Sequence, residues 1–462
     1  MDQELLDKVI KAYDIRGLVD EEISADFTFA LGIAFAKFIE REREPATIVV
    51  GEDMRPSSPD LATAFSDGIT SQGLDVIRIG LCSTDQLYFA SGALNMPGAM
   101  FTASHNPAQY NGIKLCRSGA KPIGQESGLA WIKSAIAQGF PIPNRPMGKE
   151  RSQDLLADYV KFLFSLFPEK SFAPDFQSRP LRIAIDAGNG MGGHTAPAVM
   201  REINAIVDGI YFELDGSFPN HEANPIDPKN LVDLQNLVRE KGSDIGLAFD
   251  GDADRCFLVD EKGNLVSPSA LTALIAKREL VKNPGASIIY NLICSKAVPE
   301  VIAESGGRPL RSRVGHSYIK QMMADEGAVF GGEHSGHFYF KDFWSADSGM
   351  LAALHAIAAL LESQIPLSEL MQSFNRYSLS GEINTTVVDQ GVAIDKIKSH
   401  FKDYEPGLTF DELDGLTVNA KSWWFNLRSS NTEPLLRLNV EADTQEQMAS
   451  MRDLVLQLIR NG

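Results

Sequence analysis

Short apolar runs and amphipathic stretches alternate along most of the chain. The β-branched run 46–51 predicts a buried strand, and the flanking stretches 25–39 and 58–72 carry apolar residues at helical spacing. A further short strand is predicted over 75–79. Strands that alternate with helices in this way are typical of α/β domains with mostly parallel sheets.

The order of strand, loop and helix begins again near residues 181 and 286. Because these starts are irregularly spaced, the chain is not a solenoid, and three related α/β domains in tandem are predicted instead. The last part of the chain differs, since short strand-like segments precede one closing helix over 444–460, which predicts a smaller α+β domain. A loop-like stretch over 137–153, rich in glycine and proline, marks the first boundary. The domains that we expect are 1–148, 149–264, 265–371 and 372–462.

Composition narrows the class of protein. The chain has 462 residues, of which 44% are hydrophobic and 23% charged, as in ordinary globular enzymes. Its net charge of −18 disfavours nucleic acid and anionic membranes as partners, although local arginines and lysines can still bind an anionic substrate. The four cysteines form no Cys-x-x-Cys pair, which is typical of a protein of the reducing cytoplasm. We expect no secretory signal, since the N-terminus is charged, and no membrane span, since the longest apolar stretch, 350–361, is short.

A polar turn over 102–107, with the sequence TASHNP, follows an apolar strand-like run. The turn displays one hydroxyl, that of Ser104, beside His105, and Lys114 follows after a glycine-containing turn. A hydroxyl displayed in this way is a candidate nucleophile or phosphoryl carrier. The alternative is a capped turn in which Ser104 only bonds the backbone.

Three carboxylates at alternate positions form a candidate metal site. Asp250, Asp252 and Asp254 lie on a tight loop between two strand-like runs, and oxygen ligands without histidine or cysteine favour Mg²⁺ over zinc. An EF-hand would need glycine at the sixth position, where this chain has Arg255, and it would need flanking helices. Arg255 can instead add the positive charge that a bound phosphate requires.

Two later loops offer groups for binding a sugar phosphate. Glu333, Ser335 and His337, on the loop GEHSGH, supply the donors and acceptors that sugar hydroxyls need, although a glycine turn with a capping serine is the alternative. Arg428 opens the loop RSSNTEP, where hydroxyls and an amide could complete an anion site. A serine- and threonine-rich hairpin turn is the alternative there.

Two glycine-containing loops carry weaker signals. The segment KAYDIRG places Tyr13 and Arg16 in one loop, either as a surface turn or as an anion contact. The glycines at 188, 190 and 193 have the spacing of a dinucleotide-binding loop, but a tight turn into the next helix is favoured, because a dehydrogenase would not require the candidate metal loop and hydroxyl carrier.

The segments KAYDIRG, TASHNP, DGDADR, GEHSGH and RSSNTEP, in this order over the whole chain, resemble those of the phosphohexomutases, and within that family the bacterial phosphomannomutases. The resemblance implies an α/β fold of four domains around a central cleft. Three domains would share an α/β mixed-sheet core, and a smaller α+β domain would close the chain. In order, the domains would carry the phosphoserine, Mg²⁺-binding, sugar-binding and phosphate-binding loops. We expect a monomer or weak homodimer in the cytoplasm.

The resemblance also implies a role for each candidate residue. Ser104 would carry a phosphoryl group in the resting enzyme and would complete the Mg²⁺ site of Asp250, Asp252 and Asp254. The residues implied to surround the phosphoserine are His105, Lys114 and Arg255. The residues implied to bind the substrate are Tyr13, Arg16, His316, Glu333, Ser335, His337, Arg428, Ser430, Asn431 and Thr432.

The implied reaction interconverts mannose 1-phosphate and mannose 6-phosphate through a hexose 1,6-bisphosphate, which also acts as activator. Mg²⁺, Arg255 and Lys114 would offset the charge on the transferred group. GEHSGH and Asn431 resemble the mannose-type members, whereas Ile293 stands near the place where some dual-specificity members have lysine. The alternatives are a phosphoglucomutase, a dual-specificity enzyme, a phosphoglucosamine mutase, a phosphatase with a phosphoserine intermediate and a non-catalytic sugar-phosphate-binding protein.

Overall fold

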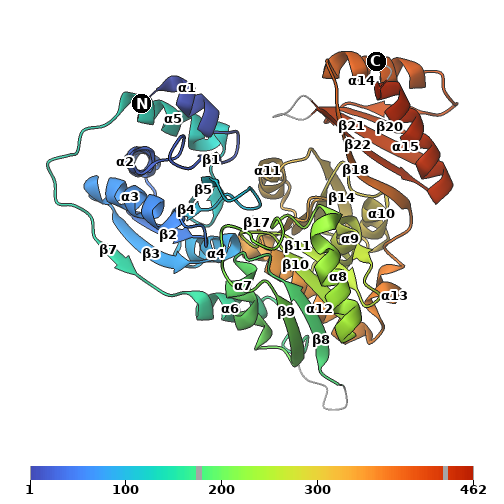
Figure 1. The fold of residues 1–462 in the computed structure, drawn as a ribbon, viewed down its shortest axis with the longest axis horizontal. Coiled ribbons are helices and arrows are strands. Elements are labelled where there is room, and N and C mark those ends of the chain that lie inside the picture. The colour runs from blue at the N-terminus through green and yellow to red at the C-terminus, as the bar shows by residue number, and fades with distance from the viewer. Residues whose placement is uncertain (1, 173–178, 430–434, 461–462) are drawn as a thin grey trace.

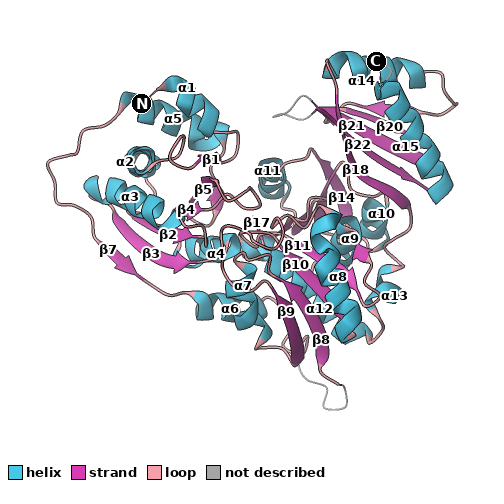
Figure 2. Cartoon of the chain, viewed as in Figure 1, coloured by secondary structure: helices cyan, strands magenta, loops and turns pink. Residues whose placement is uncertain are grey.

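The computed structural model describes residues 2–172, 179–429 and 435–460, and in these residues the chain forms four β-sheets (Figure 1). Helices accompany every sheet, as the colouring by secondary structure shows (Figure 2). The first three units pack against one another, and the C-terminal unit stands to one side (Figure 1).

The first sheet has the order β1-β5-β4-β2-β3-β7, with β6 paired to β5. Its strands are β1 (Ile15–Leu18), β2 (Thr47–Glu52), β3 (Asp75–Leu81), β4 (Gly98–Phe101), β5 (Tyr110–Arg117), β6 (Lys121–Pro122) and β7 (Glu150–Ser152). The strands β4, β2, β3 and β7 run parallel, whereas β5 is antiparallel to both β4 and β1. The helices are α1 (Gln3–Val9), α2 (Ala25–Glu42), α3 (Ser58–Ser71), α4 (Thr84–Leu94), the π-helix η1 (Gln125–Leu129) and α5 (Ala130–Gln138).

Helices α2 and α3 approach each other closely because two glycines face across their contact. A Cβ atom added at Gly32 would lie 2.1 Å from the carbonyl oxygen of Phe65, and one added at Gly68 would lie 2.2 Å from that of Phe29. Only glycine fits at such a crossing. The hydroxyl of Ser24 accepts a hydrogen bond from the backbone N–H of Phe27 and caps α2.

The second and third sheets repeat a related plan, with parallel strands followed by an antiparallel pair. In the second sheet, order β12-β11-β10-β8-β9, the strands are β8 (Leu181–Asp186), β9 (Ala205–Ile210), β10 (Ile245–Phe249), β11 (Cys256–Asp260) and β12 (Leu265–Val266). In the third, order β14-β13-β15-β16-β17, they are β13 (Ser287–Asn291), β14 (Arg308–Ser312), β15 (Phe330–Gly332), β16 (Phe338–Phe340) and β17 (Ala346–Asp347).

The helices of these two units follow the strands along the chain. They are α6 (Leu156–Ser165), α7 (Gly192–Met200), η2 (Pro228–Leu231), α8 (Val232–Lys241), α9 (Pro268–Lys282), α10 (Ala297–Glu304), α11 (His316–Glu326), η3 (Lys341–Phe343), α12 (Gly349–Ser363) and α13 (Leu367–Met371). The apolar stretch near 350–361 is thus the buried helix α12, as predicted. Among the helices of the described residues, none has the length and hydrophobicity needed to cross a bilayer.

The C-terminal unit is an antiparallel sheet of order β18-β22-β21-β20-β19. Its elements are β18 (Ser378–Thr386), α14 (Gln390–Phe401), β19 (Thr409–Asp411), β20 (Leu416–Asn419), β21 (Trp423–Ser429), β22 (Leu435–Ala442) and α15 (Gln445–Arg460). This unit has a hydrophobic core of its own, whereas one continuous core runs through parts of the first three units. Stacked rings of Phe162 and Trp344, 4.9 Å apart, pack against that shared core.

The predicted fold class, three mixed α/β domains and an α+β domain, is therefore confirmed. Three local predictions are wrong. The sheets are mixed rather than mostly parallel, the supposed loop 137–153 contains the end of α5 and strand β7, and the glycine-containing turn before Lys114 lies inside β5. Edge strands such as β7 are short and exposed, so they lack the apolar run that identifies a buried strand. The domain boundaries themselves stay a prediction.

Candidate active site

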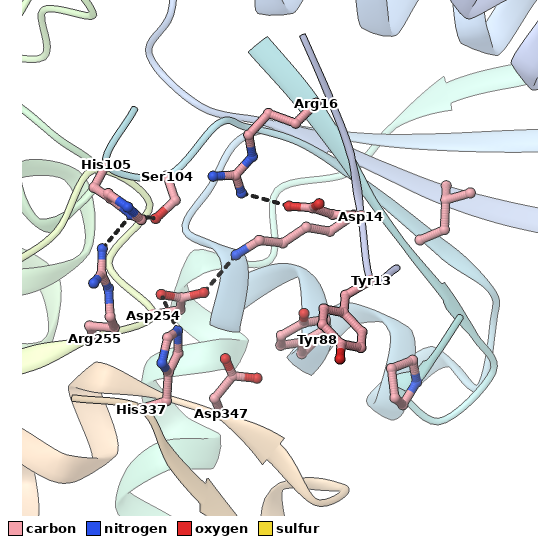
Figure 3. A pocket seen from close by; sticks show the side chains of 13 residues that line it. Tyr13, Asp14, Arg16, Tyr88, Ser104, His105, Asp254, Arg255, His337 and Asp347 are labelled. Carbon is pink, nitrogen blue, oxygen red and sulfur yellow. Dashed lines mark hydrogen bonds and ion pairs between the residues drawn. The ribbon is translucent and has the colours of Figure 1, made fainter. Parts of the chain in front are cut away.

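Side chains of the first three units line one pocket, drawn in Figure 3. Ser104 follows strand β4, Asp250 follows β10 and Glu333 follows β15, so the loops at the ends of three central strands meet here. The residues that line the pocket are Tyr13, Asp14, Arg16, Tyr88, Ser104, His105, Lys114, Leu115, Pro122, Asp254, Arg255, His337 and Asp347.

The backbone of Ser104 has an unusual conformation. Its φ is +49°, in the left-handed region that L-residues rarely occupy. Its N–H donates to the hydroxyl of Thr102 at 2.9 Å, and its own hydroxyl donates to Oδ2 of Asp250 at 2.8 Å. Strain of this kind persists only where surrounding contacts hold it, and it is frequent at functional sites. The hydroxyl thus points from the first unit towards the carboxylate loop of the second.

The three aspartates predicted to bind a metal form a buried cluster. Asp250, Asp252 and Asp254 are each at most 1% exposed. Potential ligand oxygens of the three lie within 4.8 Å of one another. Within the described part of the chain, Oδ1 of Asp252 and Oδ1 of Asp254 have no hydrogen-bond partner. Buried carboxylate oxygens without partners are costly unless a cation meets them. The cluster therefore fits a small divalent cation that prefers oxygen ligands, such as Mg²⁺.

Neighbouring groups shift the pKa values of the aspartates of this cluster in different directions. Burial, followed by the charges of Asp254 and Asp252, raises the pKa of Asp250 to about 7 against the opposing effect of Arg255. Burial also acts on Asp252, but the Lys114 ammonium, 2.7 Å from its Oδ2, holds the pKa of this carboxyl far below its usual range. Lys114 lies 2.6 Å from Oδ2 of Asp254 as well. The protein alone thus supplies too little positive charge for three carboxylates.

His105 and Arg255 lie beside the Ser104 hydroxyl (Figure 3). Arg255 donates from Nε to Oδ2 of Asp250 at 2.9 Å and from Nη2 to Nδ1 of His105 at 2.6 Å. Burial and the Arg255 charge hold the pKa of His105 well below its usual value, so the imidazole is neutral. Nδ1 therefore accepts, and it lies 3.2 Å from the Ser104 hydroxyl oxygen.

The GEHSGH loop reaches the same place from the third unit. An isolated backbone bridge joins Arg255 to His337, and Nε2 of His337 lies 3.7 Å from Oδ1 of Asp254. The Ser335 hydroxyl is 3.0 Å from Nδ1 of His337. Buried Glu333 accepts from the hydroxyl of Tyr339 at 2.7 Å and also from the backbone N–H of Gly315, which precedes α11.

Other predicted residues lie at the rim or farther away. Tyr13 and Arg16 line the pocket, and Arg16 donates to Asp14 at 2.6 Å. Arg428 is the penultimate residue of β21 in the fourth unit, where it forms an ion pair with Glu382, and it does not line the pocket. His316 begins α11, and its side chain is not described. Ser430, Asn431 and Thr432 lie outside the described residues.

The structure also brings in residues that the sequence analysis did not single out. Lys320 is buried, lies 2.6 Å from Asp347 and sits over the ring of Tyr88 at 4.4 Å. Thr84 donates from its hydroxyl to Oδ2 of Asp252 at 2.6 Å, and its backbone N–H donates to the carbonyl of Asp252. Its place in the chain could have identified Thr84 as a candidate. It begins the helix that follows a predicted strand, at the sheet edge where α/β proteins bind ligands.

Comparison with known proteins assigns the family. The chain matches the four phosphoglucomutase/phosphomannomutase domains, with α/β/α domain I at residues 7–140, domain II at 157–263, domain III at 267–377 and the C-terminal domain at 382–458. It is 39% identical over 443 residues to a phosphomannomutase of Escherichia coli K12, covering 94% of each chain. It is 38% identical to a phosphomannomutase of Methanocaldococcus jannaschii, covering 98% of this chain and 97% of that protein. The chain therefore belongs to the phosphoglucomutase/phosphomannomutase family.

Further relatives agree with this assignment. Proteins of Xanthomonas campestris described as phosphohexose mutases are 37% identical over 433 residues, covering 93% of this chain and 94% of theirs. A crystal structure of a phosphoglucomutase/phosphomannomutase family protein from Burkholderia thailandensis aligns with a TM-score of 0.86 at 29% identity, over 100% of this chain and 98% of that one.

Proposed function

We propose that this protein is a phosphomannomutase, an isomerase that interconverts mannose 1-phosphate and mannose 6-phosphate. The observation that carries the proposal is the Ser104 hydroxyl, held in a strained loop 2.8 Å from Asp250 at the edge of a buried carboxylate cluster. Full-length relatives described as phosphomannomutases support the same activity. The sugar, the site residues and the cofactor below are part of this proposal.

Phosphorylated Ser104 gives its phosphoryl group to the free C6 hydroxyl of mannose 1-phosphate, so the bond from Oγ to phosphorus breaks as the new ester forms. The hexose 1,6-bisphosphate then turns over in the cleft and returns its C1 phosphoryl group to Ser104, which leaves mannose 6-phosphate. Asp250, Asp252 and Asp254 would hold Mg²⁺, which offsets charge on the phosphoryl oxygens when bound. Arg255, fixed by Asp250, adds positive charge at the same place.

The proton of the attacking hydroxyl needs an acceptor near the carboxylate cluster. Burial opposes the charge of Lys114, but Asp252 and Asp254 raise its pKa well above its usual value, so this ammonium keeps its proton and supplies charge. His337 lies beside Asp254 in the pocket and is the acceptor that we assign (Figure 3). Glu333 and Ser335 would bind sugar hydroxyls, with Tyr13, Arg16 and His316 around them.

Phosphate recognition away from the reacting centre belongs to the fourth unit in this proposal. Arg428, Ser430, Asn431 and Thr432 would hold the phosphate that does not react, in either orientation of the bisphosphate. A hexose 1,6-bisphosphate would also serve as activator by phosphorylating Ser104. All four cysteines are buried and free, which supports the reducing cytoplasm as the place of action. Because one chain carries all these residues, the proposed reaction needs no second subunit, and a monomer or weak homodimer is the form that we propose.

A second candidate is a dual-specificity enzyme that also converts glucose 1-phosphate, because relatives described as phosphohexose mutases match the chain over nearly its whole length. A coupled assay with mannose, glucose and glucosamine 1-phosphates, Mg²⁺ and glucose 1,6-bisphosphate tests both candidates. We expect turnover of mannose 1-phosphate and labelled phosphate on Ser104, and neither with Ser104→Ala. Release of inorganic phosphate without isomerisation would identify a phosphatase, and turnover of glucosamine 1-phosphate alone would refute the assigned sugar.

A further inference from the structure

Arg55 lies behind the Ser104 loop, outside the pocket and its described lining. Only 1% of this residue is exposed. Its Nη2 donates to the carbonyl oxygens of Ser104 at 2.9 Å and Asn106 at 2.7 Å. Its Nη1 donates to the carbonyl oxygens of Pro107 at 3.0 Å and Tyr110 at 2.9 Å. One guanidinium group therefore binds four backbone carbonyls, three in the turn that displays Ser104 and one at the start of β5.

Contacts on its other sides fix Arg55 in turn. Its Nε lies 3.3 Å from Oδ2 of buried Asp53, an ion pair without the alignment of a hydrogen bond. Oδ1 of Asp53 accepts from the hydroxyl of Ser58 at 2.7 Å and from the backbone N–H of Arg55 at 3.0 Å. The ring of Phe218, from the second unit, lies 5.2 Å from the guanidinium carbon. The charge of Arg55 is thus balanced locally.

One of the carbonyls that Arg55 binds is that of Ser104, the residue with the strained backbone. Ser104 has its positive φ between two restraints, since its N–H donates to Thr102 and its C=O accepts from Arg55. The second unit packs closely against this carbonyl, because a Cβ atom added at Gly251 would lie only 2.3 Å from it. A Ser104 loop released by Arg55 could relax towards common backbone conformations, and the hydroxyl would then leave Asp250.

We propose that Arg55 is a positioning residue for phosphoryl transfer, which holds the backbone of Ser104 so that its oxygen keeps one direction with and without the phosphoryl group. The inference rests on the proposed phosphoserine function. Arg55 acts through geometry, because its Nε is paired with the Asp53 carboxylate and its Nη1 and Nη2 donate to backbone carbonyls. Lysine would keep the charge but lacks the planar fork that reaches several carbonyls together.

The test measures single turnovers of the labelled enzyme. Wild type, Arg55→Met and Arg55→Lys are phosphorylated with labelled glucose 1,6-bisphosphate and mixed with mannose 1-phosphate in a rapid-quench apparatus. The rate constant for loss of label reports on the geometry of transfer, whereas the amplitude reports on the fraction of folded, phosphorylated protein. Arg78→Met is the matched control, since Arg78 pairs with Glu52 on the neighbouring strand of the same sheet.

We expect the rate constant to fall about 100-fold in Arg55→Met and about tenfold in Arg55→Lys, as for small displacements of a reacting group and for outer-shell ligands. The KM for mannose 1-phosphate should change less than about threefold, because Arg55 does not line the pocket. Arg78→Met should match wild type. If Arg55→Met does not fold, Arg55→Lys decides the question.

Two results overturn the inference. The first is a rate constant within about threefold of wild type in both variants. The second is a loss confined to amplitude and melting temperature, which would make Arg55 a stabilising residue only. A wild-type enzyme that takes up no label refutes the proposed function itself, and the inference fails with it.

Discussion

Asp85 joins three units of the molecule, and its ionisation gives a measurable pH dependence of stability. This buried carboxylate, at the start of α4, accepts a hydrogen bond from Ser83, from Tyr159 of the second unit at 2.7 Å and from Ser348 of the third unit at 2.7 Å. Burial outweighs these donors and raises its pKa from 3.8 to about 6. Asp85 directly follows Thr84, whose hydroxyl donates to Asp252 of the carboxylate cluster.

The sign follows from proton counting. Between about pH 4 and pH 6 the folded state binds more protons at Asp85 than the unfolded state, so stability falls as pH rises through this window. The shift of roughly two pKa units corresponds to a loss on the order of 3 kcal/mol between pH 4 and pH 7. Asp85→Asn removes this loss, because an amide stays neutral. The amide accepts some of these hydrogen bonds less well than the carboxylate does. This difference changes the free energy of unfolding by an amount that does not depend on pH.

The assay is denaturant unfolding of wild type and Asp85→Asn at intervals from pH 4 to pH 7. The titrations of other carboxylates cancel in the difference between the two proteins. We expect this difference to move in favour of Asp85→Asn by about 3 kcal/mol as pH rises. The control is Asp453→Asn on the exposed face of α15, where Arg452 lowers the carboxyl pKa and no such gain is expected. A flat difference between wild type and Asp85→Asn would refute the reasoning.

Two further substitutions test the carboxylate cluster and its contact with Ser104. Thr84→Val removes the hydroxyl that donates to Asp252 at 2.6 Å, so the Mg²⁺ concentration for half-maximal activity should rise about 10- to 100-fold; an unchanged Mg²⁺ titration would contradict this. Gly251→Ala places a Cβ atom 2.3 Å from the Ser104 carbonyl and should lower kcat about 100-fold, with a stability loss of about 1–3 kcal/mol. The control is Gly391→Ala in α14, where the nearest atom is a side-chain oxygen at 3.4 Å; equal kcat values in both variants would exclude the steric argument.

Much of the local structure follows from the chain alone. The run 181–186, apolar except for Arg182 and Asp186, coincides with β8, and the apolar run 245–249 coincides with β10, because strands covered on both faces of a sheet need mainly apolar residues. The alternate aspartates of DGDADR were recognisable from the sequence as well, because their spacing along one tight loop is enough to bring three carboxylates together. The occurrence of five short segments in one fixed order along the chain then indicated the family.

Tertiary structure alone decided which groups support those segments. Arg55 and Ser104 are 49 positions apart, Thr84 and Asp252 are 168 apart, and Asp85 and Ser348 are 263 apart. No periodic pattern links such positions, because each contact depends on how whole sheets and helices pack. The strained φ of Ser104 is likewise invisible in its residue type, since it depends on the neighbouring Thr102 on one side and on the distant Arg55 on the other. The sequence therefore determined the reacting groups, and the packing of the domains determined their geometry.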